Sequence, residues 1–122
     1  MPPEAPGGQG GRDGRRLRDI LEAAEEIAGY LDGCGLDRFL ADRMRQRAVE
    51  RLLTIVGEAA KQLGEETRAA IPQPWREIIR FRDKGIHAYD SLSPQTLFRI
   101  ATESIPALRE AVSRHRGEGR PR

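Results

Sequence analysis

The sequence predicts an all-α fold, an up-and-down bundle of four main helices with one additional short helix. Apolar residues recur at steps of three and four over most of the chain, which is the period of an amphipathic helix. No segment shows the alternation of apolar and polar residues that is typical of a half-buried strand. Glycines and prolines divide the periodic segments, and the short connections that result favour antiparallel helices packed side by side.

The first predicted helix begins near Arg15 and ends where Gly33 and Gly35 flank Cys34. Glycine is the residue that most often terminates a helix. The apolar positions that recur along this segment are Leu17, Ile20, Leu21, Ala24, Ile27, Ala28 and Leu31. Cys34 is either a reactive thiol or a small buried residue in a turn, and we favour the buried residue.

The second predicted helix is the longest, from about residue 37 to residue 63, and Gly64 ends it. Its apolar positions are Leu40, Met44, Ala48, Leu52, Ile55, Val56, Ala59 and Leu63. Gly57 in its interior costs about 1 kcal/mol relative to alanine, so we expect a neighbouring helix to approach closely there. Glu58, beside it, is either exposed or directed towards a site.

Four arginines lie mostly off that apolar row: Arg43, Arg45, Arg47 and Arg51. They either follow a phosphate backbone or form a solvated flank balanced by Asp42 and Glu50, and we favour the solvated flank. The net charge of +2 is too small to indicate a nucleic-acid-binding protein by itself.

A short helix is expected over Glu65–Ala70, before prolines interrupt the chain. Pro74 suits the first turn of the next helix, in which we interpret Trp75 as a core anchor. Ser93 is a good N-cap for the last helix because Pro94 follows it.

The last helix is expected to run to about Arg114, with a kink at Pro106, which removes a backbone donor from the helix. Three segments follow from these boundaries. Residues 1–14, rich in glycine and proline, are expected to form a disordered tail, residues 15–114 the helical bundle, and residues 115–122 a disordered basic tail.

Cysteine usage and hydropathy indicate a soluble cytoplasmic protein with no membrane association. A single cysteine cannot form an intramolecular disulfide, which fits a reducing compartment. No stretch approaches the roughly 20 apolar residues of a membrane span, and the first residues lack the apolar run of a signal peptide.

The candidate functional segment is residues 81–90, FRDKGIHAYD, which brings Arg82, Asp83, His87 and Tyr89 close together in sequence. On a regular helix Asp83 and His87 share a face, whereas Arg82 and His87 lie about 140° apart. Those two could converge on one substrate if the helix loosens near Gly85 or if another chain supplies part of the site. The alternative is an exposed helix end with solvated charges, which the spacing alone favours.

Several kinds of catalytic site are excluded by the motifs that the sequence lacks. It contains no glycine-rich phosphate loop, no H-E-x-x-H, no paired cysteines and no G-x-S-x-G elbow. His87 has no second ligand cluster at helical spacing, so we expect neither a metal nor another cofactor. An arginine, an acid and a histidine suit metal-free phosphoryl chemistry on RNA, in which His87 moves a proton and Arg82 neutralises the phosphate.

The residues that carry this chemistry also carry a resemblance to a known family. Arg82, four residues, His87 and then Tyr89 resemble the R-x4-H-x-Y signature of HepT-like toxins with a HEPN domain, of the HEPN/MNT type. The segments RLRDILEAAEEIAGYL, VGEAAKQL, PWREIIRFRDKGIHAYD and SIPALREAV are similar to that family in the same order. The resemblance covers residues 15–114. It departs from the common pattern at Asp83, where many members have asparagine.

The resemblance implies a homodimer in which two R-x4-H motifs face each other across a cleft. It implies a metal-independent endoribonuclease, the toxin of a type VII-like toxin–antitoxin module. Arg82 would bind and stabilise the phosphate, His87 would be the acid/base, and Asp83 would orient His87 or the substrate. The partners would be RNA and a minimal nucleotidyltransferase antitoxin, which would transfer AMP to Tyr89. The alternative is a non-catalytic HEPN module that binds a nucleotidyltransferase or RNA.

Overall fold

The computed structural model of the chain describes residues 9–86 and 93–118, with side-chain environments for residues 11–82 and 93–117. The described part is helical and contains no strand, which confirms the predicted fold class. His87 and Tyr89, as well as the side chain of Asp83, lie outside what the structure describes.

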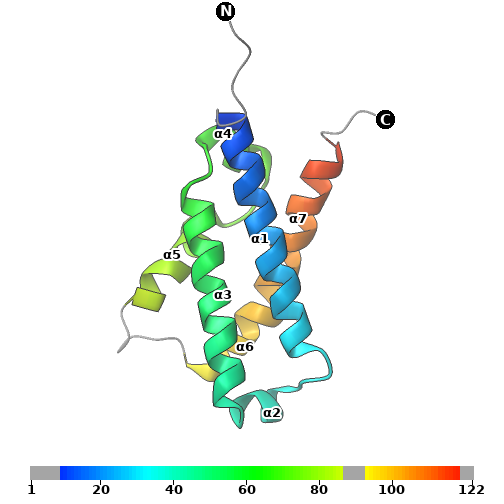
Figure 1. Ribbon diagram of the computed structural model, residues 1–122, viewed down its shortest axis with the longest axis vertical. Coiled ribbons are helices and arrows are strands. Elements are labelled where there is room, and N and C mark those ends of the chain that lie inside the picture. Colours follow the sequence, from blue (N-terminus) through cyan, green and yellow to red (C-terminus); the bar gives the residue numbers. More distant parts are fainter. Residues whose placement is uncertain (1–8, 87–92, 119–122) are drawn as a thin grey trace, which may run out of the picture.

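Four helical segments run alternately up and down (Figure 1). They are α1 (Gln9–Leu31), α3 (Arg43–Lys61), α5 (Trp75–Ile86), and a last segment formed by α6 (Pro94–Arg99), η2 (Ile100–Ser104) and α7 (Ile105–Glu118). Two short helices, α2 (Leu36–Leu40) and α4 (Glu65–Ala70), lie at opposite ends of the bundle. The start of α1 and the end of α7 therefore lie at the same end, next to α4.

Helix α1 begins at Gln9, so our expectation of a helix start near Arg15 was wrong. The cause is Asp13, whose side chain is buried and accepts hydrogen bonds from Gly64 N at 3.1 Å and from Thr67 Oγ1. This carboxylate satisfies a backbone donor at the start of α4, which has no N-cap side chain of its own. The glycine-rich composition of residues 9–14 concealed a helical turn held by a residue 51 positions away.

The last helix was also predicted too short, because α7 continues past Arg114 to Glu118. Arg116 Nη1 donates a hydrogen bond to the backbone oxygen of Gly14 at 3.3 Å, which joins the end of α7 to the first turns of α1. Residues 9–14 and 115–118 thus belong to the bundle and not to tails, whereas residues 1–8 and 119–122 lie outside the described residues.

The predicted long second helix is two helices, α2 and α3, separated at Ala41 and Asp42. Asp42 is the N-cap of α3, and its carboxylate accepts a hydrogen bond from Arg45 N at 3.0 Å. The break changes which side of the segment is buried. Met44 is 85% exposed instead of lying in the core, and Val49 and Leu53 are buried in its place.

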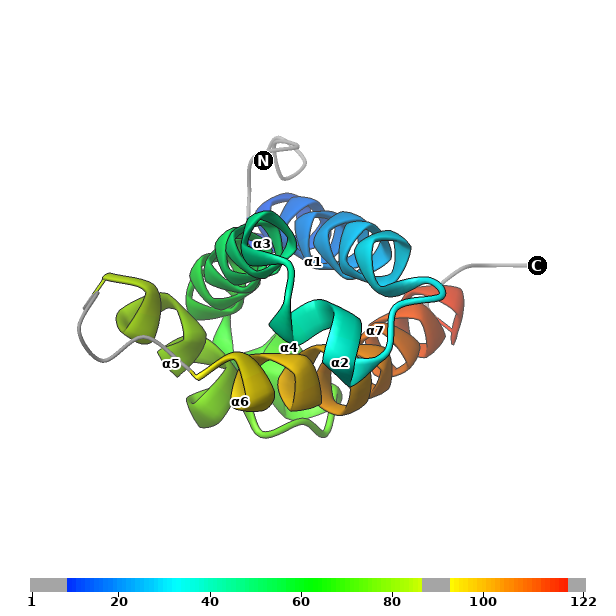
Figure 2. The same ribbon diagram turned by 90° about the horizontal axis from the view of Figure 1, so that it is seen from below.

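The core lies between α3 and its two neighbours, α1 and α5, with the α6–α7 segment closing the other side (Figure 2). Its largest fully buried side chains are Phe39, Ile20, Ile27, Leu53, Ile71, Ile105, Leu108, Val49, Val56 and Val112. Phe39 of α2 packs against Phe98 with ring centroids 5.3 Å apart, so the short helix is fixed to α6. Cys34 is buried, as favoured above.

Several predicted boundaries are confirmed. The short helix spans Glu65–Ala70, and Ser93 caps α6 by accepting a hydrogen bond from Thr96 N at 3.2 Å. Near Pro106, where we expected a kink, the helix contains a π-helical turn, η2, which ends at Ser104; such turns are rare and occur mostly as single turns inside α-helices. None of the described helices is both long and apolar enough to cross a membrane.

Candidate functional site

Helix α5, which carries Arg82, packs closely on α3 at Gly57, as the sequence predicted. A Cβ atom placed on Gly57 would lie 2.6 Å from Arg82 N and 3.0 Å from Arg82 Cβ. It would also lie 3.1 Å from the backbone oxygen of Ile78, one turn earlier in α5. Gly57 therefore sets the distance between the two helices at the residue proposed to bind phosphate.

The other end of α5 is fixed by Trp75. Its indole Nε1 donates to the backbone oxygens of Arg68 at 3.0 Å and Ile71 at 2.9 Å, at the end of α4. One turn later Ile78 is buried against the core. Trp75 is therefore the anchor that we predicted, and it fixes where the helix starts. A helix held at Trp75 and at Gly57 leaves little freedom in the backbone position of Arg82.

Arg82 is the one predicted site residue whose side-chain environment the structure describes. It is half-buried and stands four residues before the end of α5 at Ile86. Asp83 is in the same helix by its backbone. The helix includes Gly85, so it does not loosen before Ile86. Whether His87 and Tyr89 converge with Arg82 stays a prediction, since both lie outside the described residues.

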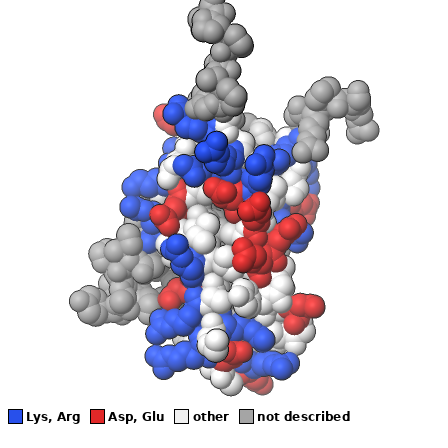
Figure 3. Space-filling model, in the orientation of Figure 1, with Lys and Arg blue, Asp and Glu red and all other residues white. Residues whose placement is uncertain are grey.

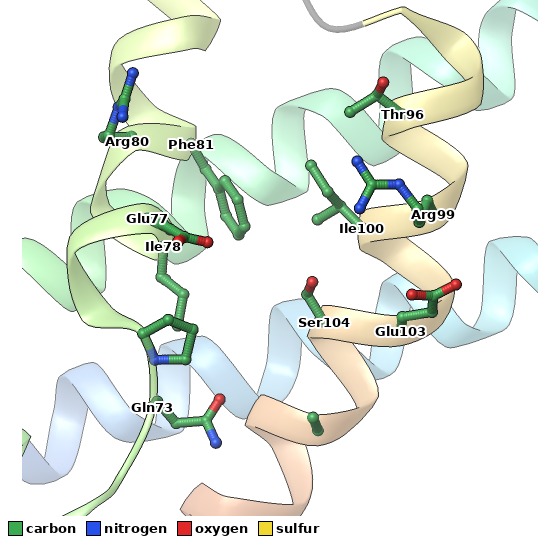
Figure 4. Close-up of a pocket in the computed structure, with 12 residues that line it drawn as sticks. Gln73, Glu77, Ile78, Arg80, Phe81, Thr96, Arg99, Ile100, Glu103 and Ser104 are labelled. Carbon is green, nitrogen blue, oxygen red and sulfur yellow. The ribbon is translucent and has the colours of Figure 1, made fainter.

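A hollow of about 530 Å³ lies on another side of α5, between it and the α6–α7 segment (Figure 4). Phe81 and Ile100 form apolar walls, and the charged groups around them include Glu77, Arg99 and Glu103. This hollow was not predictable from local sequence patterns, because its lining comes from two separate helical segments that only packing brings together. Phe81, next to Arg82 in sequence, places the hollow beside the candidate site.

The remaining sequence-based alternatives can now be assigned in part. Glu58 is exposed. Among the described side chains of residues 11–82 and 93–117, no three of His, Cys, Asp or Glu gather closely enough to hold a metal ion. The arginines at the start of α3 lie on the surface, and their arrangement is described below.

The bundle and the close α3–α5 contact define a small helical domain that presents an arginine near the end of its third long helix. A model of the family described as "Ribonuclease HepT-like" matches residues 20–115. The chain therefore belongs to the HepT-like ribonuclease family, as its motifs suggested.

Curated relatives agree with this assignment. A probable ribonuclease HepT of Thermococcus cleftensis is 40% identical over 94 residues, which cover 76% of this chain and 86% of the relative. A putative RNase of Methanocaldococcus jannaschii is 37% identical over 91 residues, covering 74% of this chain and 75% of the relative. A putative RNase of Caldanaerobacter subterraneus is 34% identical over 97 residues, which cover 79% of this chain and 87% of the relative. No solved structure matches the chain significantly.

Proposed function

We propose that this protein is a metal-independent endoribonuclease whose catalytic residues are Arg82 and His87. The observation that carries the proposal is the fixed position of Arg82, where α5 meets Gly57 of α3 in a chain of the HepT-like ribonuclease family. A guanidinium held on a rigid helix suits stabilisation of charge on a phosphate, because little reorganisation is needed as that charge develops.

In this mechanism Arg82 binds the scissile phosphate and His87 transfers the proton. A histidine can accept a proton from the attacking hydroxyl and return it to the leaving oxygen, which is general acid–base catalysis. Asp83 orients His87 or the substrate. RNA itself supplies a nucleophile beside each phosphate in its 2′-hydroxyl, so an RNA with 2′-deoxyribose at the cut position should resist cleavage.

The test is cleavage of RNA in the presence of EDTA by wild type, Arg82→Ala and His87→Ala. Loss of the acid/base group should lower the rate by about 10²–10⁴-fold, while helical content is retained. Arg80→Ala is the matched control, because Arg80 is an exposed arginine of the same helix, and its rate should stay near that of wild type. A strict requirement for a divalent metal, or wild-type rates in either site variant, would contradict the assignment.

We expect the active form to be a homodimer with the two R-x4-H motifs facing each other. The support is the angle of about 140° between positions 82 and 87 on a regular helix, which a site drawing on both chains would overcome. A two-fold dimer is the commonest assembly of identical chains. Sedimentation at micromolar concentration measures this directly, and a monomer that still cleaves RNA at full rate would rule out a shared site.

We also expect the protein to be the toxin of a toxin–antitoxin pair, neutralised by AMP transfer to Tyr89. The phosphate of an attached AMP would place negative charge next to the position that binds RNA phosphate, as phosphorylation would. Incubation with the cognate nucleotidyltransferase, ATP and magnesium should add the mass of AMP to the peptide that contains Tyr89 and stop cleavage. Tyr89→Phe should retain activity and escape this neutralisation. Full neutralisation of Tyr89→Phe would show instead that the antitoxin acts by occlusion.

A further inference from the structure

Three arginines form a stripe on the surface of α3: Arg43, Arg47 and Arg51, which we call the arginine stripe. They are spaced by four residues, so they lie on one side of the helix about 6 Å apart along its axis. Residues 43–51 hold four arginines and one glutamate, a net charge of +3. Figure 3 shows that Lys and Arg side chains gather at this end of the molecule, over the start of α3.

The stripe is poorly neutralised by the part of the chain that the structure describes. Arg43 and Arg51 are exposed and make no ion pair there. Arg47 contacts Glu50 at 3.3 Å, but its side chain is 63% exposed, and an exposed pair of this kind contributes little. Arg45, which is off the stripe, is the arginine that pairs with Asp42, at 3.5 Å. Our initial interpretation of a solvated flank balanced by Asp42 and Glu50 therefore holds for Arg45 and Arg47, whereas Arg43 and Arg51 pair with no acidic side chain of the described residues.

The stripe also opposes the local requirements of the helix. Positive side chains are unfavourable in the first turns, where the helix dipole is positive, and like charges four residues apart repel each other. Helix α3 has no acidic residue in its first turn, although its N-cap, Asp42, is acidic. Local features that work against helix formation are commonest at functional positions. An anionic partner would remove both unfavourable terms.

The stripe lies next to the start of α6. A hollow of about 390 Å³ is lined by Arg43, Arg47 and Glu50 of α3 together with Pro94 and Leu97 of α6. Pro94 is the first residue of α6, and the segment between α5 and α6 contains His87. Leu40 lines the same hollow and adds apolar surface. Farther along α3, Gly57 packs against Arg82. The same helix therefore carries both the arginine stripe and the contact with the arginine of α5.

We propose that the arginine stripe binds the phosphate backbone of single-stranded RNA on one side of the cleavage site. This inference rests on the proposed ribonuclease function and extends it from one phosphate at Arg82 to a longer binding track. A row of cations that follows the backbone is one part of the usual arrangement for binding single strands without reading their sequence. Phosphate contacts of this kind position the strand and leave the choice of base to other residues.

The test measures binding separately from cleavage. The probe is a fluorescein-labelled, single-stranded 2′-O-methyl RNA of mixed sequence, whose blocked 2′ positions prevent its cleavage. Its anisotropy is followed at several salt concentrations for wild type and for the triple variant R43Q/R47Q/R51Q. The logarithm of the association constant falls as the logarithm of the salt concentration rises. Losing three phosphate contacts should make this slope less steep by about 2. At 0.1 M salt this corresponds to a loss of affinity of about 100-fold, if affinity at 1 M is unchanged.

Two matched variants separate a site from a general effect of charge. R12Q/R15Q/R18Q removes three exposed arginines from the first half of α1, at the opposite end of the bundle, and should leave the slope unchanged. R43K/R47K/R51K keeps the positive charge, so the dependence of its RNA binding on salt should be nearly as steep as that of wild type. Circular dichroism should show the same helical content in all three variants. If R43Q/R47Q/R51Q unfolds, the folded lysine variant still allows the comparison with wild type.

The outcomes distinguish this inference from the proposed function. A protein that binds the probe through the stripe but cleaves no RNA would support the inference and contradict the ribonuclease assignment. Equal loss of slope in the α1 and α3 glutamine variants, or no binding of the probe by wild type, would overturn the stripe as a site. Unchanged RNA binding together with lost binding of the nucleotidyltransferase would assign the stripe to a protein interface and would also overturn it.

Discussion

Gly57→Ala is the substitution for which the structure gives the sharpest expectation. In an isolated helix, alanine in place of an interior glycine is stabilising by about 1 kcal/mol. Here the new Cβ would lie 2.6 Å from Arg82 N, whereas ordinary van der Waals contact begins at 3.4 Å. Helix α5 would have to move by about 0.8 Å, and the obstructing atom is backbone, which cannot rotate away as a side chain can.

Overpacking of this kind typically costs about 1–3 kcal/mol. Subtracting the gain in helix propensity leaves a net destabilisation between about 0 and 2 kcal/mol. The effect on activity should be larger than the effect on stability. A displacement near 1 Å of a group that holds the phosphate can lower the rate by about 10²-fold. We therefore expect Gly57→Ala to be folded, slightly less stable and strongly impaired in RNA cleavage.

Gly29→Ala is the control, because Gly29 is an exposed glycine in the last turn of α1 with no atom within 4 Å of its added Cβ. Urea unfolding at a fixed protein concentration should show Gly29→Ala to be more stable than wild type and Gly57→Ala to be less stable. RNA cleavage should be unchanged in Gly29→Ala. If Gly57→Ala gained the same stability as Gly29→Ala and cleaved RNA at the wild-type rate, the close contact would not position Arg82.

Two further substitutions test the contacts that fix the ends of the site-bearing helices. Asp13→Ala should lower the free energy of unfolding by about 1–3 kcal/mol, because it removes a buried carboxylate that accepts a hydrogen bond from Gly64 N. Asp19→Ala removes a half-buried pair with Arg16 near the surface and should lower the free energy of unfolding by less than about 1 kcal/mol in the same urea titration. Trp75→Phe removes the indole donor and should lower the free energy of unfolding by about 1–2 kcal/mol. A melting temperature equal to that of wild type would show that the two indole hydrogen bonds do not hold α5 in place.

Local sequence signals predicted most of the fold because most of its boundaries are set locally. Ser93 followed by Pro94 marks the start of α6, and glycine inside α3 marks the contact with α5. The errors occurred where the deciding interaction is long-range or ambiguous. Asp13 is held by α4, far away in sequence. Asp42 could cap a new helix or continue the old one, and the apolar row through Met44 favoured continuation.

The sequence suggests residues for the candidate site but not their arrangement. The order of Arg82, His87 and Tyr89 in the sequence led to the family, which the comparison with known proteins confirmed. Their convergence depends on the path of the chain after Ile86, which helical spacing does not determine. The three arginines of the stripe were visible in the sequence together with Arg45, but only the structure shows that Arg45 and Arg47 have acidic partners and that Arg43 and Arg51 have none among the described residues.

Helix α3 is thus expected to serve the reaction in two separable ways, through Gly57 at the α5 contact and through the arginine stripe nearer its start. A dinucleotide has a single phosphodiester, so it offers the stripe no phosphate while it occupies Arg82. Gly57→Ala should therefore lower kcat/KM for a dinucleotide and for a longer RNA alike. R43Q/R47Q/R51Q should raise KM for the longer RNA and leave the dinucleotide unaffected. Equal impairment of the dinucleotide by both variants would mean that the stripe acts through the structure of the site and not by binding RNA.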